Sequence, residues 1–129
     1  MTGPGGGVPE ALLAAHAHSA AGRYAAAVPL YEQALTLDLA PVPRRQALAG
    51  LGVAHRWLGD YADAVAILRA GVAEFPDFAP MRAFLAVALY SAGQADEAVS
   101  LLLHLYAEHA GEYRDAIARH ADHLDDPLP

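Results

Sequence analysis

The side chains best suited to chemistry in this chain of 129 residues are its seven histidines. A histidine can bind a metal ion or transfer a proton near neutral pH, and a zinc site needs three or four ligands in a defined geometry. His120 and His123 have a spacing that places both on one helix face, with Asp122 and Glu112 close in sequence. Because the pattern fixes no third ligand, we predict solvated side chains and no metal site. A histidine-based binder of a metal or small ligand is an alternative.

A second histidine pattern and the serines also have simple explanations. His104 and Glu108 are four residues apart on an outer helix face, a spacing at which side chains ordinarily stabilise the helix. The serines form no pattern with an acid and a base, and the glycine run near the start precedes no strand. We therefore predict no catalytic residues, no cofactor-binding residues and a protein that is not an enzyme.

Composition indicates a folded, soluble protein and argues against two classes of partner. The chain is 55% hydrophobic and 18% charged, which is typical of a globular domain. Its formal net charge of −7 repels phosphate backbones and anionic lipids, so we predict neither nucleic acid nor a membrane as a partner. The absence of cysteine excludes disulfides and thiolate ligands. With no visible signal peptide or apolar span, we expect a cytoplasmic location.

The elements that position these residues repeat along the chain. Residues 45–76 hold two helix-length stretches with a period of about 3.6 residues, separated by Gly59-Asp60, which indicates a helical hairpin. The Gly59 landmark recurs at Gly22, 37 residues earlier, and at Gly93, 34 residues later. A helical period of about 34 residues is that of the tetratricopeptide repeat. We predict an all-α, right-handed solenoid of three hairpins plus a C-terminal capping helix, about seven helices in total.

Alanine and glycine at matching positions explain how these helices can pack closely. In each hairpin a small residue of the first helix is expected to face a small residue of the second. These pairs are Ala15 with Ala27, Gly52 with Ala64, and Ala86 with Ala98. A third small position, Ala34 or Gly71, admits the next hairpin, but its equivalent in the third hairpin is Leu105.

The predicted boundaries follow from these landmarks. We expect a disordered leader over 1–8, repeats over about 9–41, 44–78 and 79–111, a capping helix over 112–124, and a flexible tail over 125–129.

Prolines and aspartates refine the expected helix ends. Pro29 lies inside the second expected helix, where it removes a hydrogen bond, so we expect a bend or a late helix start. The stretch 39–44 holds two prolines and is expected to be a loop. Asp60 and Asp77 are expected to cap the helices that follow them.

The chain resembles tetratricopeptide-repeat proteins, most clearly at Leu51-Gly52, Gly59-Asp60-Tyr61 and Gly93. Over roughly residues 10–124 it is also similar to a family of small bacterial proteins of about this length. That resemblance implies a protein-interaction role and a homodimer, and no enzymatic activity. It also implies that His18 and His55, which stand where the repeat usually has a tyrosine between its helices, are hydrogen-bonded core residues.

The resemblance further implies a binding groove lined by the first helix of each hairpin. Carried over by position, the groove residues are Leu12, His16, Gln46, Ala49, Val53, Arg56, Trp57, Ala83, Val87 and Tyr90. Repeats that grip chaperone C-terminal carboxylates have Lys, Arg and Asn at such positions, whereas His16, Val53, Pro80 and Phe84 stand there in this chain. We predict a scaffold that binds a protein or peptide. The alternatives are a structural dimerisation unit of a larger complex and, for Trp57, packing beneath the turn before Gly59.

The helix expected from Ala95 is apolar around too much of its circumference for a single contact face. Its inward face is expected to consist of Ala98, Val99, Leu102 and Tyr106. Further leucines flank this face, and the capping helix offers Ile117, Leu124 and several alanines, which can cover one flank but hardly both. We therefore predict a dimer interface of Leu101, Leu103, Leu105 and Ile117. The alternative is a monomer in which the capping helix covers both flanks.

Overall fold

The computed structural model describes residues 7–126, and in this part of the chain the regular structure is entirely helical. The helices are α1 (Glu10–Ala20), α2 (Tyr24–Leu35), α3 (Pro41–Trp57), α4 (Tyr61–Glu74), α5 (Ala79–Ser91), α6 (Ala95–Ala107) and α7 (Arg114–Asp122). A short 3-10 helix, η1 (Gly111–Tyr113), precedes α7. The predicted all-α class is confirmed. Most of the expected leader and part of the tail lie outside the described residues.

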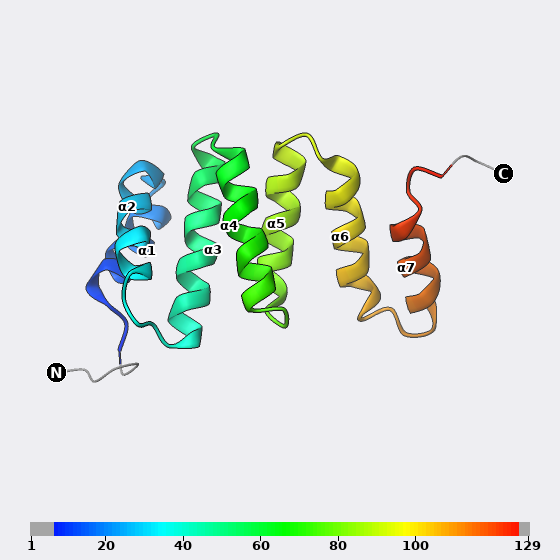
Figure 1. Ribbon diagram of the computed structural model, residues 1–129, viewed down its shortest axis with the longest axis horizontal. Coiled ribbons are helices and arrows are strands. Elements are labelled where there is room, and N and C mark those ends of the chain that lie inside the picture. Colours follow the sequence, from blue (N-terminus) through cyan, green and yellow to red (C-terminus); the bar gives the residue numbers. More distant parts are fainter. Residues whose placement is uncertain (1–6, 127–129) are drawn as a thin grey trace.

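The helices stand side by side in chain order, with α1 and α2 at one end and α7 at the other (Figure 1). Three antiparallel hairpins pair α1 with α2, α3 with α4, and α5 with α6. The first helices also contact one another, α1 with α3 and α3 with α5, so they form one continuous layer. This layer is the face on which the candidate site is built.

The turn inside each hairpin has the same geometry. Gly22, Gly59 and Gly93 adopt φ values of 76°, 83° and 84°, which glycine reaches without the strain that a Cβ would cause. The residue after each glycine donates its backbone N–H to a carbonyl five residues earlier, at 2.8 to 2.9 Å. This bond closes the helix end and starts the returning helix, as in a Schellman motif. The three predicted glycines therefore form the same turn in each of the three hairpins.

The predicted small residues are buried where the paired helices meet. Ala15, Ala27, Ala64, Ala86 and Ala98 are 0 to 4% exposed. A Cβ built on Gly52 would lie 2.4 Å from Cγ of Leu68 on α4. One on Gly71 would lie 2.7 Å from the sulfur of Met81, in the next hairpin. The small residues therefore determine how closely the helices approach one another, both within a hairpin and between neighbouring hairpins.

Two expectations about prolines were wrong, one of them only in part. The stretch 39–44 is not a loop, because α3 begins at Pro41, which occupies the first helical position. Prolines in a first helical turn lose no hydrogen bond, since those N–H groups have no partner within the helix. Pro29 causes no late start, because α2 begins at Tyr24 and continues past it, while the alternative of a bend at Pro29 stays a prediction.

The expected aspartate caps and the last helix ends also need correction. The side chain of Asp60 makes no capping hydrogen bond, because its carboxylate lies 3.3 Å from Nδ1 of His55. Phe78, not Asp77, is the N-cap residue of α5. Helix α6 ends at Ala107 rather than near Gly111, which has a φ of 57° and begins η1.

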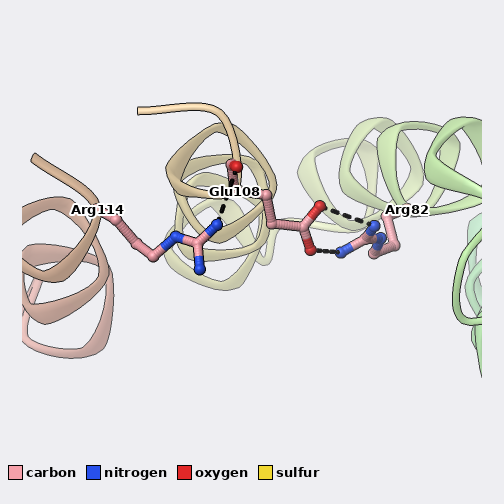
Figure 2. Close-up of polar contacts among 3 residues, drawn as sticks. All are labelled: Arg82, Glu108 and Arg114. Atoms are coloured by element: carbon pink, nitrogen blue, oxygen red, sulfur yellow. Dashed lines mark hydrogen bonds and ion pairs between the residues drawn. The ribbon is translucent and has the colours of Figure 1, made fainter. Parts of the chain in front are cut away.

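Helix α7 is tied to the third hairpin by a polar cluster around Glu108, the C-cap residue that follows α6. Arg82 of α5 donates two hydrogen bonds to the Glu108 carboxylate, at 2.6 and 3.2 Å, and Arg114 of α7 donates to its carbonyl oxygen at 3.1 Å (Figure 2). Hydrogen bonding from Arg82 lowers the pKa of Glu108. A second link joins His104 of α6 to Asp122 of α7, at 2.7 Å.

Candidate functional site

An apolar hollow on the layer of first helices lies between α1, α3 and α5. It has a volume of about 450 Å³. Its lining is His16, Ser19, Tyr31, Gln46, Ala49, Gly50, Val53, Phe78, Pro80 and Phe84. Close packing at Gly50 shapes its wall, since a Cβ there would lie 2.4 Å from the ring of Tyr31. The hollow is therefore a preformed apolar site of the kind that accepts a large side chain.

A smaller cavity of about 230 Å³ adjoins the first, and Val53 and Phe84 line both. Its other lining residues are Arg56, Trp57, Leu68 and Val87. Trp57 is 59% exposed, and its ring stacks on Tyr24 of α2 with a centroid distance of 5.8 Å. Trp57 is therefore held in place by packing while most of its surface stays accessible. We call the two cavities together the groove.

The larger cavity has a cluster of hydrogen-bonded polar side chains at one wall, where Tyr31 of α2 meets α1. The Tyr31 hydroxyl lies 3.0 Å from Nδ1 of His16 and 3.0 Å from Oγ of Ser19. Burial lowers the pKa of His16 and raises that of Tyr31. A neutral imidazole can accept the tyrosine proton, and the phenol oxygen can then accept from serine. The cluster can offer hydrogen bonds to a ligand without placing a full charge in the cavity.

The lowered pKa of His16 predicts a pH effect on stability. The folded state binds this proton less readily than the unfolded state, whose histidine has a pKa of about 6.5, so stability is present above that pH and declines as pH falls through it. We expect urea unfolding to show a larger loss between about pH 7.5 and pH 5.5 for the native chain than for His16→Gln. Equal losses in the two proteins would contradict this prediction.

The family comparison agrees with this geometry. A family model described as Tetratrico peptide repeat matches residues 9–124. The chain belongs to this family. No curated protein matches the chain. Tetratricopeptide repeats generally mediate protein–protein interactions, so the chain is a repeat module of an interaction family.

Most of the predicted groove residues come together on this repeat module. His16, Gln46, Ala49, Val53, Arg56, Trp57 and Val87 line one of the two cavities. Leu12 is fully buried beneath α2 and α3, so its inclusion was wrong. Ala83 and Tyr90 lie outside both linings, although Tyr90 is 69% exposed.

Five residues that line the groove of the repeat module were not predicted from the sequence: Ser19, Tyr31, Gly50, Leu68 and Phe78. Tyr31 comes from a second helix and Phe78 from an inter-repeat turn, where helical periodicity of the first helices gives no signal. Ser19 lies on a first helix, and a helical wheel that placed it near His16 could have found it.

Another hollow, of about 480 Å³, lies between α4, α5 and α6, and its lining includes the ion pair of Arg69 with Glu97. That pair already neutralises its own charges, so we favour the groove.

The histidines have different interaction partners from those that their spacing in the sequence suggested. His104 pairs with Asp122 rather than with Glu108. His123 pairs with Asp126 at 2.9 Å, and His120 is exposed. His18 accepts a hydrogen bond from Arg23, and His55 contacts Asp60, but both histidines are only partly buried, so the expectation that they are core residues was wrong.

One group of residues among those described has the composition of a cation site, and sequence spacing did not indicate it. His55, Asp60 and Asp63 each offer a ligand atom, and these atoms lie within 4.8 Å of one another. Both aspartates are exposed, and the imidazole of His55 already contacts Asp60. The arrangement is explained by this pairing, so we build no function on it.

The apolar residues of α6 that are exposed are not the ones that we predicted to be exposed. Val99, Leu102 and Tyr106, which were expected to face inward, are 46%, 44% and 62% exposed. The leucines expected at a dimer interface, Leu101, Leu103 and Leu105, are half-buried, as is Ile117. The reason is that α6 packs against α5 on one side and α7 on the other, leaving the stripe between them uncovered.

Across the described residues, none of the helices combines the length and the apolar character needed to cross a bilayer.

Proposed function

We propose that this protein is a scaffold that binds a segment of a partner protein in the groove. The observation that carries the proposal is that two apolar cavities adjoin on the layer of first helices and share Val53 and Phe84. Adjoining cavities suit neighbouring side chains of one chain segment, because alternate side chains can enter successive hollows. The interaction role of the family supports the same conclusion.

Trp57 supplies the first test of this proposal. Its side chain lines the smaller cavity, 59% exposed, and tryptophan is enriched among residues that dominate binding energy. We expect Trp57→Ala to weaken binding of a groove peptide by more than about 2 kcal/mol. Calorimetry would measure this with a peptide selected from a random library, and Trp57 fluorescence would report binding to the native chain.

Tyr90→Ala is the matched control, because Tyr90 is a more exposed aromatic residue outside both cavity linings. We expect it to change the affinity by no more than about 0.5 kcal/mol. An unchanged affinity in Trp57→Ala would remove Trp57 from the binding surface. A failure of library selection to yield any peptide that alters Trp57 fluorescence would count against the groove itself.

A second copy of the chain is the second partner that we propose. The specific observation is the exposed stripe of Val99, Leu102 and Tyr106 on α6, flanked by the half-buried Leu103. Leaving such side chains in water forgoes about 1.5 to 3 kcal/mol for each. A two-fold dimer would cover the stripe with its own counterpart. This also accommodates the alternative of a dimerisation unit within a larger complex.

Light scattering measures this second proposal directly. We expect a dimeric mass for the native chain and a monomeric mass for Leu102→Asp, with circular dichroism confirming that the variant is folded. A monomeric native chain at high protein concentration would exclude the dimer. A dimer retained in the folded variant would place the interface elsewhere, with Leu103→Asp as the next test.

A further inference from the structure

Two arginines, which we call the groove arginines, place positive charge in the groove and beside it. Arg56 lines the smaller cavity, with its guanidinium 5.0 Å from the ring centroid of Trp57. Arg45 lies over the ring of Phe78, which lines the larger cavity, at 4.3 Å. Both arginines come from α3, at its two ends. Stacking on a ring restrains a guanidinium while leaving its edge available to an acceptor.

We propose that the segment bound in the groove is apolar in its middle and carries a carboxylate toward each end, one for Arg45 and one for Arg56. This inference rests on the groove being the binding site. It goes further by naming the chemistry of the partner segment, an acidic and apolar stretch of protein.

The distribution of acidic residues supports the inference. The chain has 15 aspartates and glutamates and a net charge of −7, yet neither cavity is lined by a single carboxylate. Where arginines have a counter-charge, it is supplied by the chain itself: Arg44 pairs with Glu74, Arg69 with Glu97, and Arg82 with Glu108. The groove is therefore a cationic and apolar strip on an otherwise acidic protein.

The two groove arginines differ from those three in their partners. Among the described residues, the ion pairs include neither Arg45 nor Arg56. Arg56 donates through Nε to the neutral hydroxyl of Ser91, at 2.9 Å. Nε of Arg45 is buried and has no hydrogen-bond partner. A carboxylate is the acceptor that a guanidinium binds most strongly, so an acidic ligand supplies what the chain does not.

The spacing of the arginines sets the reach of the ligand. Eleven residues separate Arg45 from Arg56, which corresponds to about 16 Å along a helix. An extended peptide covers that distance in about five residues. Between the two cations the floor is Ala49, Val53 and Phe84, all apolar. A segment with two acids about five residues apart and large apolar side chains between them matches this strip in charge and in shape.

The experiment is selection of peptides of about twelve residues from a random library on the native chain, followed by titration of the best binders. We expect enrichment of Asp or Glu on both sides of an apolar centre. We expect Asp→Asn or Glu→Gln in a selected peptide to weaken binding about tenfold, because the charge-assisted hydrogen bond to the guanidinium is lost. Arg45→Gln and Arg56→Gln should each weaken binding similarly and abolish the preference for one of the two peptide acids.

Arg119→Gln is the matched control, because Arg119 is exposed on α7 and its replacement makes the same change in net charge. Circular dichroism and thermal unfolding would show that each variant is folded. Peptides that bind the groove, as judged by Trp57 fluorescence, but show no acidic enrichment would overturn this inference and leave the groove intact. An equal loss in Arg119→Gln would also overturn it, because the effect would then be one of net charge. Absence of any groove binder would contradict the proposed function itself.

Discussion

Replacing Tyr31 by alanine is expected to lower the free energy of unfolding by about 3 to 5 kcal/mol, the range for truncating a large aromatic residue in a core. Tyr31 is 1% exposed and is among the largest fully buried side chains of the described residues. Its ring packs over Gly50 of α3 and meets the His16 ring edge-on at a centroid distance of 5.5 Å. Removing it opens a cavity where the first hairpin meets the second. Urea unfolding, followed by circular dichroism, measures the loss.

Tyr31→Phe separates the contribution of the ring from that of the hydroxyl. The ring packing is kept, but the hydroxyl that hydrogen-bonds to His16 and Ser19 is removed, so we expect a loss of about 1 kcal/mol. The same variant should alter ligand binding if the hydroxyl cluster contacts the bound segment. If Tyr31→Ala were no more destabilising than Tyr31→Phe, the ring would not be the main link between the first two hairpins.

The hairpins could be predicted from the sequence because the signals that form them are local. Gly22, Gly59 and Gly93 mark turns whose left-handed backbone conformation glycine reaches without strain, and this requirement is visible in sequence without knowledge of the rest of the fold. The small residues at helix contacts recur with the same period for the same reason. Helix ends that depend on a competing partner were not visible. Asp60 looks like an N-cap in sequence, but His55 contacts its carboxylate across the turn.

The groove could be predicted only in part, because its walls come from different kinds of element. Residues of α3 such as Val53 and Trp57 follow one helical face, so periodicity places them correctly. Tyr31 and Phe78 reach the groove through packing between hairpins, which no local pattern records. The exposed stripe on α6 was misjudged for a related reason. Which part of an apolar helix is covered depends on where α5 and α7 sit against it, and sequence alone does not give those positions.

Gly52→Leu is expected to lower the free energy of unfolding by about 3 kcal/mol or more, at the upper end of the range for overpacking a core. Gly52 is buried on α3, and even a Cβ at this position would lie 2.4 Å from Cγ of Leu68 and 2.5 Å from its Cδ2. Leu68 is itself 1% exposed and cannot turn outward without leaving the core. The added side chain must therefore push α3 and α4 apart. Because Leu68 also lines the smaller cavity, any folded fraction should have lost the shape of the groove.

The milder change Gly52→Ala is the more telling measurement, because two effects oppose each other. Alanine is favoured over glycine in a helix interior by about 0.8 to 1.0 kcal/mol, so the substitution would stabilise α3 if space were available. The 2.4 Å contact is shorter than a Cβ tolerates, and overpacking by even a small group costs about 1 to 3 kcal/mol. We therefore expect Gly52→Ala to destabilise the protein, whereas Ala66→Leu, on the exposed face of α4, should change stability by less than about 0.5 kcal/mol. A stabilising Gly52→Ala would mean that α3 and α4 can separate freely, and the glycine would then not be what holds the central hairpin closed.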